Sequence, residues 1–191
     1  YGQNETLSAA LKNKVDEIVK NHPSQGEKIK ATLDFVQNDI RYLGLEYGIS
    51  GYKPNPPNKV FDQRYGDCKD KSLLMVHMLR AMDVEAHPLL LSTTMKETIL
   101  AMPPSPGWFD HCVVKVIEND GHSLYYDPTI SNQGGTFKNT HFPDYGCGLV
   151  IKKGNKEFDE IISASNNLVV TNEEYVLDKI NGGAKLKVTS T

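Results

Sequence analysis

The sequence predicts an α+β fold, with helices as far as residue 82 and an antiparallel sheet after them. Two observations carry this prediction. Apolar residues recur at helical spacing in three segments up to Met82, and beyond it the pattern changes to short β-branched or aromatic runs separated by turns. Because the helices precede the strands rather than alternate with them, an antiparallel sheet is favoured.

The helices are expected at about 6–20, from residue 24 to about 40, and from 68 to about 82. Ser24 followed by Glu27 is a capping box, which satisfies backbone N–H groups at a helix start. The third helix follows Gly66 and Asp67, a turn residue and a good N-cap. The apolar residues with helical spacing in the first two helices are Leu7, Leu11, Val15 and Ile18, then Ile29, Leu33, Val36 and Ile40.

Two long loops are predicted from their Gly, Pro and Asn content. Residues 43–60 form the first, and its part 55–60 is interpreted either as one wall of a cleft or as a plain surface loop. Residues 94–109 form the second, which contains three prolines and the only tryptophan, Trp108. This loop would cover the cleft, unless Trp108 simply belongs to the core.

Four short runs predict the strands, and Asn119-Asp120-Gly121 marks a tight turn between the second and third. Two further runs near the end predict a hairpin around Gly182. We therefore expect one domain over residues 1–165, and a following β-rich module or C-terminal β extension from 166 to 191. The four runs are "VEAHPLLLST", "HCVVKVIE", "SLYYDP" and "GLVIKK".

Composition excludes several classes of protein. A net charge of -3 with no Lys/Arg-rich run argues against a nucleic-acid partner. No apolar stretch approaches the roughly 18 residues of a membrane helix, so no transmembrane segment is expected. The three cysteines lack paired CxxC spacing and are too few for a disulfide scaffold, so neither metal nor cofactor is expected.

Cys68 is the strongest candidate for a reactive group. As the first helical residue after Asp67, its sulfur would lie at the positive end of the helix dipole, which favours a thiolate. The unpaired backbone N–H groups at this helix start could also receive an oxyanion. Asp67 and Asp70 oppose a thiolate, so a cationic partner is needed. The alternative is a small residue tolerated at a helix start.

His111 and Asp127 are the candidates for the partner groups. Among six histidines, His111 alone opens an alternating strand directly after a Pro- and Trp-containing loop. Asp127 ends the next strand, before Pro128. A hairpin turning at 119–121 would bring the two side chains to one end of the sheet. Each residue taken alone is more often structural than catalytic.

Three motifs together resemble the transglutaminase-like superfamily of papain-like cysteine enzymes, and its bacterial branch embedded among β-rich modules. They are "YGDCKDKSLLMVHMLRAMDVEAHPLLLST", "FDHCVVKV" and "YYDPT", within roughly residues 25–152. The resemblance implies a central helix carrying Cys68, packed on an antiparallel sheet that carries His111 and Asp127. It also implies an extracytoplasmic location, periplasmic or secreted. The chain starts at Tyr1 rather than Met, so we read it as a piece of a longer or processed protein.

The reaction implied is attack by Cys68 on an amide or peptide carbonyl through a thioester. Hydrolysis by a peptidase or amidase is favoured over transamidation. The implied partners are a protein or peptide substrate and flanking β-rich domains of the same polypeptide. The backbone N–H of Cys68 would be one oxyanion donor, and Tyr42 and Gln63 are the candidates for a second.

Two other interpretations stay open. The chain could be a binding or scaffolding module that keeps the fold without activity. It could also bind a metal at a site formed by Cys68, His111, Cys112 and Asp127. Neighbouring strand residues point to opposite faces, so His111 and Cys112 are poorly placed to share a metal. We therefore expect Cys112 to face the core behind the site, and sequence alone does not decide whether it pairs with Cys147.

Overall fold

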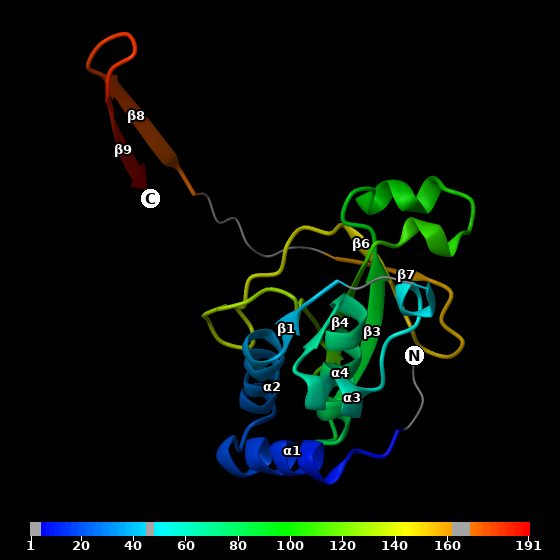
Figure 1. Ribbon diagram of the computed structural model, residues 1–191. Helices are drawn as coiled ribbons and strands as arrows, with labels where there is room; N and C mark the ends of the chain where they lie inside the picture. Colours follow the sequence, from blue (N-terminus) through cyan, green and yellow to red (C-terminus); the bar gives the residue numbers. More distant parts are fainter. Residues whose placement is uncertain (1–4, 45–47, 162–168) are drawn as a thin grey trace.

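The computed structural model describes residues 5–44, 48–161 and 169–191. Its main body is layered: helices α1 and α2 cover α4, and α4 covers one face of a five-stranded sheet (Figure 1). The predicted α+β class, with a central helix on an antiparallel sheet, is confirmed. None of the helices in these residues combines the length and the apolarity that crossing a bilayer requires.

The two N-terminal helices are α1 (Ala9–Asn21) and α2 (Gln25–Asp39). In α1 the buried residues are those of the predicted apolar stripe, Leu11, Val15 and Ile18. The predicted capping box of α2 is confirmed, since Ser24 accepts from the Glu27 backbone while the Glu27 side chain accepts from the Ser24 backbone.

The predicted loop 43–60 contains more structure than expected. A 3₁₀ turn, η1 (Gly48–Gly51), is followed by a short helix, α3 (Pro57–Gln63). Proline suits the first turn of a helix, where its missing N–H has no partner to lose. Beyond α3, the two-residue strands β1 (Arg41–Tyr42) and β2 (Tyr65–Gly66) pair in parallel beside the start of α4.

Helix α4 (Cys68–Arg80) is enclosed on every side. All its residues from Cys68 to Leu79 are buried, including three charged ones in the first turn. The helix packs against α2 and α3 and against strands β3 and β4. Its predicted start after Asp67 is confirmed.

The five-stranded sheet is antiparallel throughout, in the order β5-β4-β3-β6-β7. One face, the helix face, packs on α4 through Ala86, Val114 and Val116. The other, the loop face, carries Leu89 and Val113 among the residues of a second apolar cluster. The strands are β3 (Glu85–Leu91), β4 (His111–Ile117), β5 (Ser123–Tyr126), β6 (Cys147–Val150) and β7 (Phe158–Glu160).

Two 3₁₀ turns, η2 (Lys96–Ala101) and η3 (Pro106–Trp108), form the connection between β3 and β4. The Trp108 indole N–H donates to the Pro103 carbonyl at 2.7 Å, which closes this segment on itself.

The predicted C-terminal hairpin is present as β8 (Thr171–Leu177) and β9 (Ala184–Ser190), and every residue of both strands is exposed. Tyr175 lies opposite Leu186, so these two side chains share one face of the hairpin. Residues 162–168 lie outside the described residues, and the domain boundary at 165 stays a prediction.

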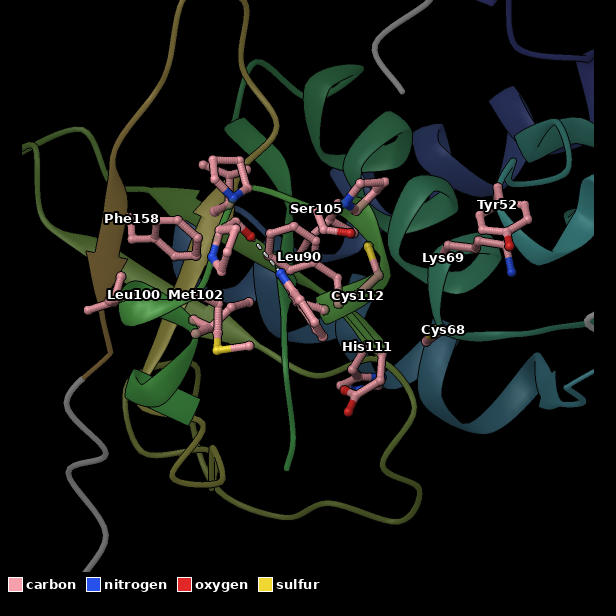
Figure 2. Close-up of a pocket in the computed structure, with 18 of the residues that line it drawn as sticks. Tyr52, Cys68, Lys69, Leu90, Leu100, Met102, Ser105, His111, Cys112 and Phe158 are labelled. Carbon is pink, nitrogen blue, oxygen red and sulfur yellow. Dashed lines mark hydrogen bonds between the residues drawn. The ribbon is translucent and has the colours of Figure 1, made fainter. Parts of the chain in front are cut away.

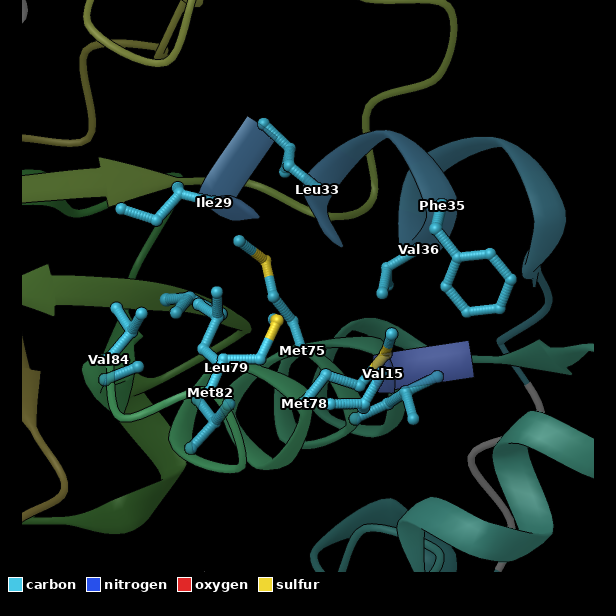
Figure 3. Packing of buried hydrophobic residues seen from close by; sticks show 14 of the residues in the cluster. Val15, Ile29, Leu33, Phe35, Val36, Met75, Met78, Leu79, Met82 and Val84 are labelled. Carbon is cyan, nitrogen blue, oxygen red and sulfur yellow. The ribbon is translucent and has the colours of Figure 1, made fainter. Parts of the chain in front are cut away.

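The main core lies between the N-terminal helices, α4 and the helix face of the sheet (Figure 3). Leu33 on α2 and Met75, Met78 and Leu79 on α4 are fully buried there. Close packing at this junction fixes α4 between two layers, and with it the position of Cys68.

Replacing Leu33 by alanine should reduce the free energy of unfolding by about 2–5 kcal/mol, because it leaves a cavity in a packed core. The matched control is Leu186→Ala, since Leu186 is 52% exposed and should change stability by less than about 0.5 kcal/mol. Urea unfolding followed by circular dichroism measures both. Equal effects of the two variants would contradict this description of the core.

Candidate active site

Hydrogen bonds to acidic side chains fix the turn that presents Cys68. The Asp67 carboxylate accepts from two backbone N–H groups of the first helical turn, both at 3.1 Å. The Asp70 carboxylate accepts from the backbone N–H groups of Asp67 at 3.3 Å and Asn55 at 2.7 Å. A Cβ on Gly66 would lie 2.6 Å from the Asp70 side chain, so this turn requires glycine.

The two carboxylates beside Cys68 are therefore already engaged. Asp67 also forms an ion pair with the ammonium group of Lys69. Burial acts to lower the pKa of Lys69, but the hydrogen bond to Asp67 and the negative charges around it outweigh burial and raise that pKa. A cation thus lies in the same helical turn as the cysteine, and it offsets the acidic neighbours.

His111 begins β4, and a hydrogen bond joins this strand to α4. The hydroxyl of Ser72, one turn after Cys68, donates to the Cys112 carbonyl at 2.9 Å. The Asp110 carboxylate accepts at 2.8 Å from a backbone N–H in the loop after β3, which fixes the approach to the strand. Cys68 therefore comes from the helical layer and His111 from the sheet. A hydrogen bond joins these two layers next to the site.

Asp127 follows β5 directly and contacts His111. Extending the β4–β5 register by one pair places Asp127 opposite Val113, and so diagonal to His111 on the same face. The carboxylate Oδ2 accepts from His111 Nε2 at 2.9 Å. Its Oδ1 accepts from the Thr129 backbone N–H at 2.8 Å and hydroxyl at 2.6 Å. The predicted hairpin thus brings the two side chains together.

The electrostatics of this cluster favour a charged histidine. Burial acts to lower the pKa of His111, but hydrogen bonds and charge interactions with Asp127 and Cys68 outweigh it and raise the pKa to about 10. Burial likewise acts to raise the pKa of Asp127, yet its bonds to His111, Thr129 and Tyr145 hold that pKa below its usual value. An imidazolium between a carboxylate and a sulfur is the favoured state at neutral pH.

Tyr145 is a member of the cluster that sequence reasoning missed. Its hydroxyl donates to Asp127 Oδ2 at 2.7 Å, and its ring lies edge-on to the His111 ring with centroids 5.6 Å apart. Burial, with the charge of Asp127, raises the pKa of Tyr145, so the hydroxyl stays a donor. Tyr145 lies in a turn just before β6, far along the chain from the three predicted residues.

Lys71 is the second missed residue, and it lies fully buried behind the site. Its ammonium group donates to the Ile40 carbonyl at 2.6 Å and to the Gln37 carbonyl at 3.4 Å, at the negative end of α2. The Gln37 side chain in turn donates to the Asp127 carbonyl at 2.9 Å. Burial lowers the pKa of Lys71 to about 8, although the charge of Asp127 opposes this.

A cavity of about 1050 Å³ opens beside Cys68 and His111 (Figure 2). The predicted cover, with Trp108, lines it through much of residues 99–109. The other wall comes from Gly51 and Tyr52, and the segment 55–60 does not line it. Cys112 lies at the cavity rather than behind it, and none of the three cysteines, all of them within the described residues, forms a disulfide.

The two predicted oxyanion residues do not line this cavity. Tyr42 is paired with Gly66 through β1 and is 46% exposed. The Gln63 amide donates to the Tyr65 carbonyl at 2.8 Å. Their roles stay predictions. Within the three described stretches of chain, no three His, Cys, Asp or Glu side chains are grouped as a metal site would require.

A helix that starts with a cysteine, packed on an antiparallel sheet that carries the histidine, defines a papain-like core of the kind found in cysteine enzymes. The family model "Transglutaminase-like superfamily" matches residues 12–128. The chain therefore belongs to the transglutaminase-like superfamily. No curated protein matches it significantly.

The chain is similar to solved structures at low sequence identity. A candidate protease from Parabacteroides distasonis superposes with a TM-score of 0.59 at 15% identity, over 82% of this chain and 28% of that one. The periplasmic domain of TgpA from Pseudomonas aeruginosa gives 0.48 at 17%, over 67% and 44%. A candidate cysteine protease from Cytophaga hutchinsonii gives 0.44 at 14%, over 96% and 61%. The chain thus spans less than two thirds of each of these proteins.

Replacing Tyr145 by phenylalanine should slow alkylation of Cys68 at pH 7 by about tenfold or more. A hydrogen bond to a charged group contributes about 1.5–3 kcal/mol, and its loss leaves Asp127 less firmly held beside His111. The matched control is Tyr125→Phe, because the Tyr125 hydroxyl donates to the Asp159 carboxylate at 2.9 Å. Peptide mass spectrometry of iodoacetamide-treated protein gives the rates. Equal rates in the two variants would argue against this role for Tyr145.

Lys71 should make stability depend on pH in a definite direction. Its pKa is about 8 in the fold and about 10.5 in the unfolded chain, so the unfolded chain binds more protons between these values. The free energy of unfolding should then rise with pH across this window, by up to about 3 kcal/mol relative to Lys71→Met. Urea unfolding at pH 7.5, 9 and 10.5 measures the difference. Parallel curves for the two proteins would show that Lys71 keeps an ordinary pKa.

Proposed function

We propose that this protein is a cysteine-dependent enzyme that cleaves an amide or peptide bond through a thioester. In this proposal Cys68 is the nucleophile, His111 its acid–base partner and Asp127 the carboxylate that orients the imidazole. The observation that carries it is the linked cluster in which His111 is bonded to Asp127 and interacts with Cys68, with its pKa raised to about 10.

The chemistry follows from these contacts. The Cys68 thiolate attacks the carbonyl carbon, and the oxyanion accepts from the backbone N–H of Cys68 at the start of α4. When the C–N bond breaks, His111 gives its proton to the departing amine, and the acyl group stays on Cys68 as a thioester. His111 then takes a proton from an attacking water, and the C–S bond breaks to release the acid.

Hydrolysis is favoured over transfer to an amine, as in the sequence resemblance, and the substrate is a protein or peptide. Flanking β-rich domains of the same polypeptide are the expected partners. An extracytoplasmic location belongs to the same proposal.

The rate at which iodoacetamide alkylates each cysteine between pH 5 and 10 tests the ion pair. At pH 6 Cys68 should react at least about tenfold faster in the wild type than in His111→Ala, because the positive charge of His111 lies beside the sulfur and favours its reaction. His22→Ala is the matched control, since His22 lies at the end of α1 away from the site, and it should leave the Cys68 rate unchanged.

Cleavage of a peptide mixture, followed by mass spectrometry, tests the reaction itself. Cys68→Ala should reduce turnover by at least about a thousandfold, as removal of a nucleophile generally does. Turnover retained in Cys68→Ala would overturn the proposal. A Cys68 that reacts as an ordinary thiol with and without His111 would instead favour a scaffolding module.

A further inference from the structure

The cavity beside Cys68 has a floor built by the sheet itself. Cys112 on β4 pairs with Leu90 on β3, Leu90 pairs with Leu149 on β6, and Leu149 pairs with Phe158 on β7. Directly paired residues share a face, so these four side chains form one row across the sheet. All four line the cavity. The row starts next to His111 and crosses three strand spacings, about 14 Å in all.

This row lies on the helix face, at the point where α4 no longer covers it. Ala86, Val116 and Val114 share the face and are fully buried under the helices. Leu90, by contrast, is only half-buried, as are Leu149 and Phe158. The helix starts at Cys68, so the part of the sheet that extends past this N-terminal end is not covered by α4. The start of α4 thus creates both the reactive sulfur and the uncovered apolar floor beside it.

The segment between β3 and β4 supplies the opposing wall, and it is apolar as well. Leu100 and Met102 line the cavity from this side (Figure 2). Trp108 lines it as well. Phe109 stacks on Phe158 with ring centroids 6.1 Å apart, which joins the wall to the far end of the floor. We call the space between floor and wall the apolar trench.

The charged groups at the cavity lie around this apolar surface and most are engaged. Lys69 is paired with Asp67, and the Asp110 carboxylate accepts from the loop after β3. Lys156 is exposed. The volume of about 1050 Å³ is at the upper end for ligand sites and exceeds what a single small side chain needs. A polar or charged group in the trench would lose its hydration without gaining partners.

We propose that the apolar trench selects amide substrates that carry a bulky aromatic or branched aliphatic group next to the reacting carbonyl. This inference rests on the proposed function, because it takes Cys68 as the nucleophile. Its specificity-determining residues are Leu90, Leu149 and Phe158, which would contact the bulky group and take no part in the chemistry.

Two alkylating probes that differ only in an apolar group test the trench without needing a substrate. The probes are iodoacetamide and N-benzyl iodoacetamide, and the readout is the ratio of their rates at Cys68, corrected by the same ratio for free N-acetylcysteine. We expect a ratio of about ten- to a hundredfold in favour of the benzyl probe, since burying a phenyl group contributes on that scale. Leu149→Glu should bring the ratio close to one.

The control is Leu186→Glu, the same substitution on the exposed strand β9, which should keep the wild-type ratio. Continued protection of buried Cys147 from both probes verifies that each variant is folded. If Leu149→Glu fails this check, Phe158→Ala at the far end of the trench replaces it and should lower the ratio. A wild-type ratio near one, with Cys68 still reactive, would overturn the proposal that the apolar trench selects bulky apolar groups. A Cys68 unreactive toward both probes would instead overturn the proposed function.

Discussion

The rest of the structure depends on the complete enclosure of helix α4. A helix that is buried from Cys68 to Leu79 can carry charges only where each one meets a partner inside the protein. Lys69 meets Asp67, Asp70 meets Asn55, and Lys71 meets the last carbonyls of α2. These partners come from different elements. The interactions therefore satisfy the buried charges and also join α4 to α2 and to the segment before α3.

The same enclosure sets the geometry of the site. Cys68 belongs to the helical layer and His111 to the sheet, and their relative position is only as firm as the contact between those layers. The bond from Ser72 to the Cys112 carbonyl fixes that contact next to the site. On the far side, Asp127 is held by His111, Tyr145 and Thr129, and its carbonyl is bonded to Gln37. Asp127 is thus held through its carboxylate by the sheet and the loops beside it, and through its backbone carbonyl by α2.

Local signals in the sequence predicted the main helices and the contact between His111 and Asp127, because capping boxes, tight turns and alternation act within a few residues. The start of α4 and the β4–β5 hairpin are of this kind. Helix α3 was missed because a seven-residue helix that begins at the second of two prolines resembles a loop in composition. Tyr145, Lys71 and the row from Cys112 to Phe158 depend on which distant segments meet, and the pairing of β3 with β6 has no local signature. Burial of Lys71 in particular contradicts the usual expectation for lysine.

The C-terminal hairpin has a consequence for how the protein behaves in concentrated solution. Tyr175, Leu177, Leu186 and Val188 are between 52% and 72% exposed, and a two-stranded hairpin has open edges on both sides. Exposed apolar side chains beside unpaired strand edges favour contact between molecules, and a net charge of -3 provides little repulsion against it. These exposed side chains and open strand edges therefore make the hairpin a surface that favours contact with other polypeptide chains.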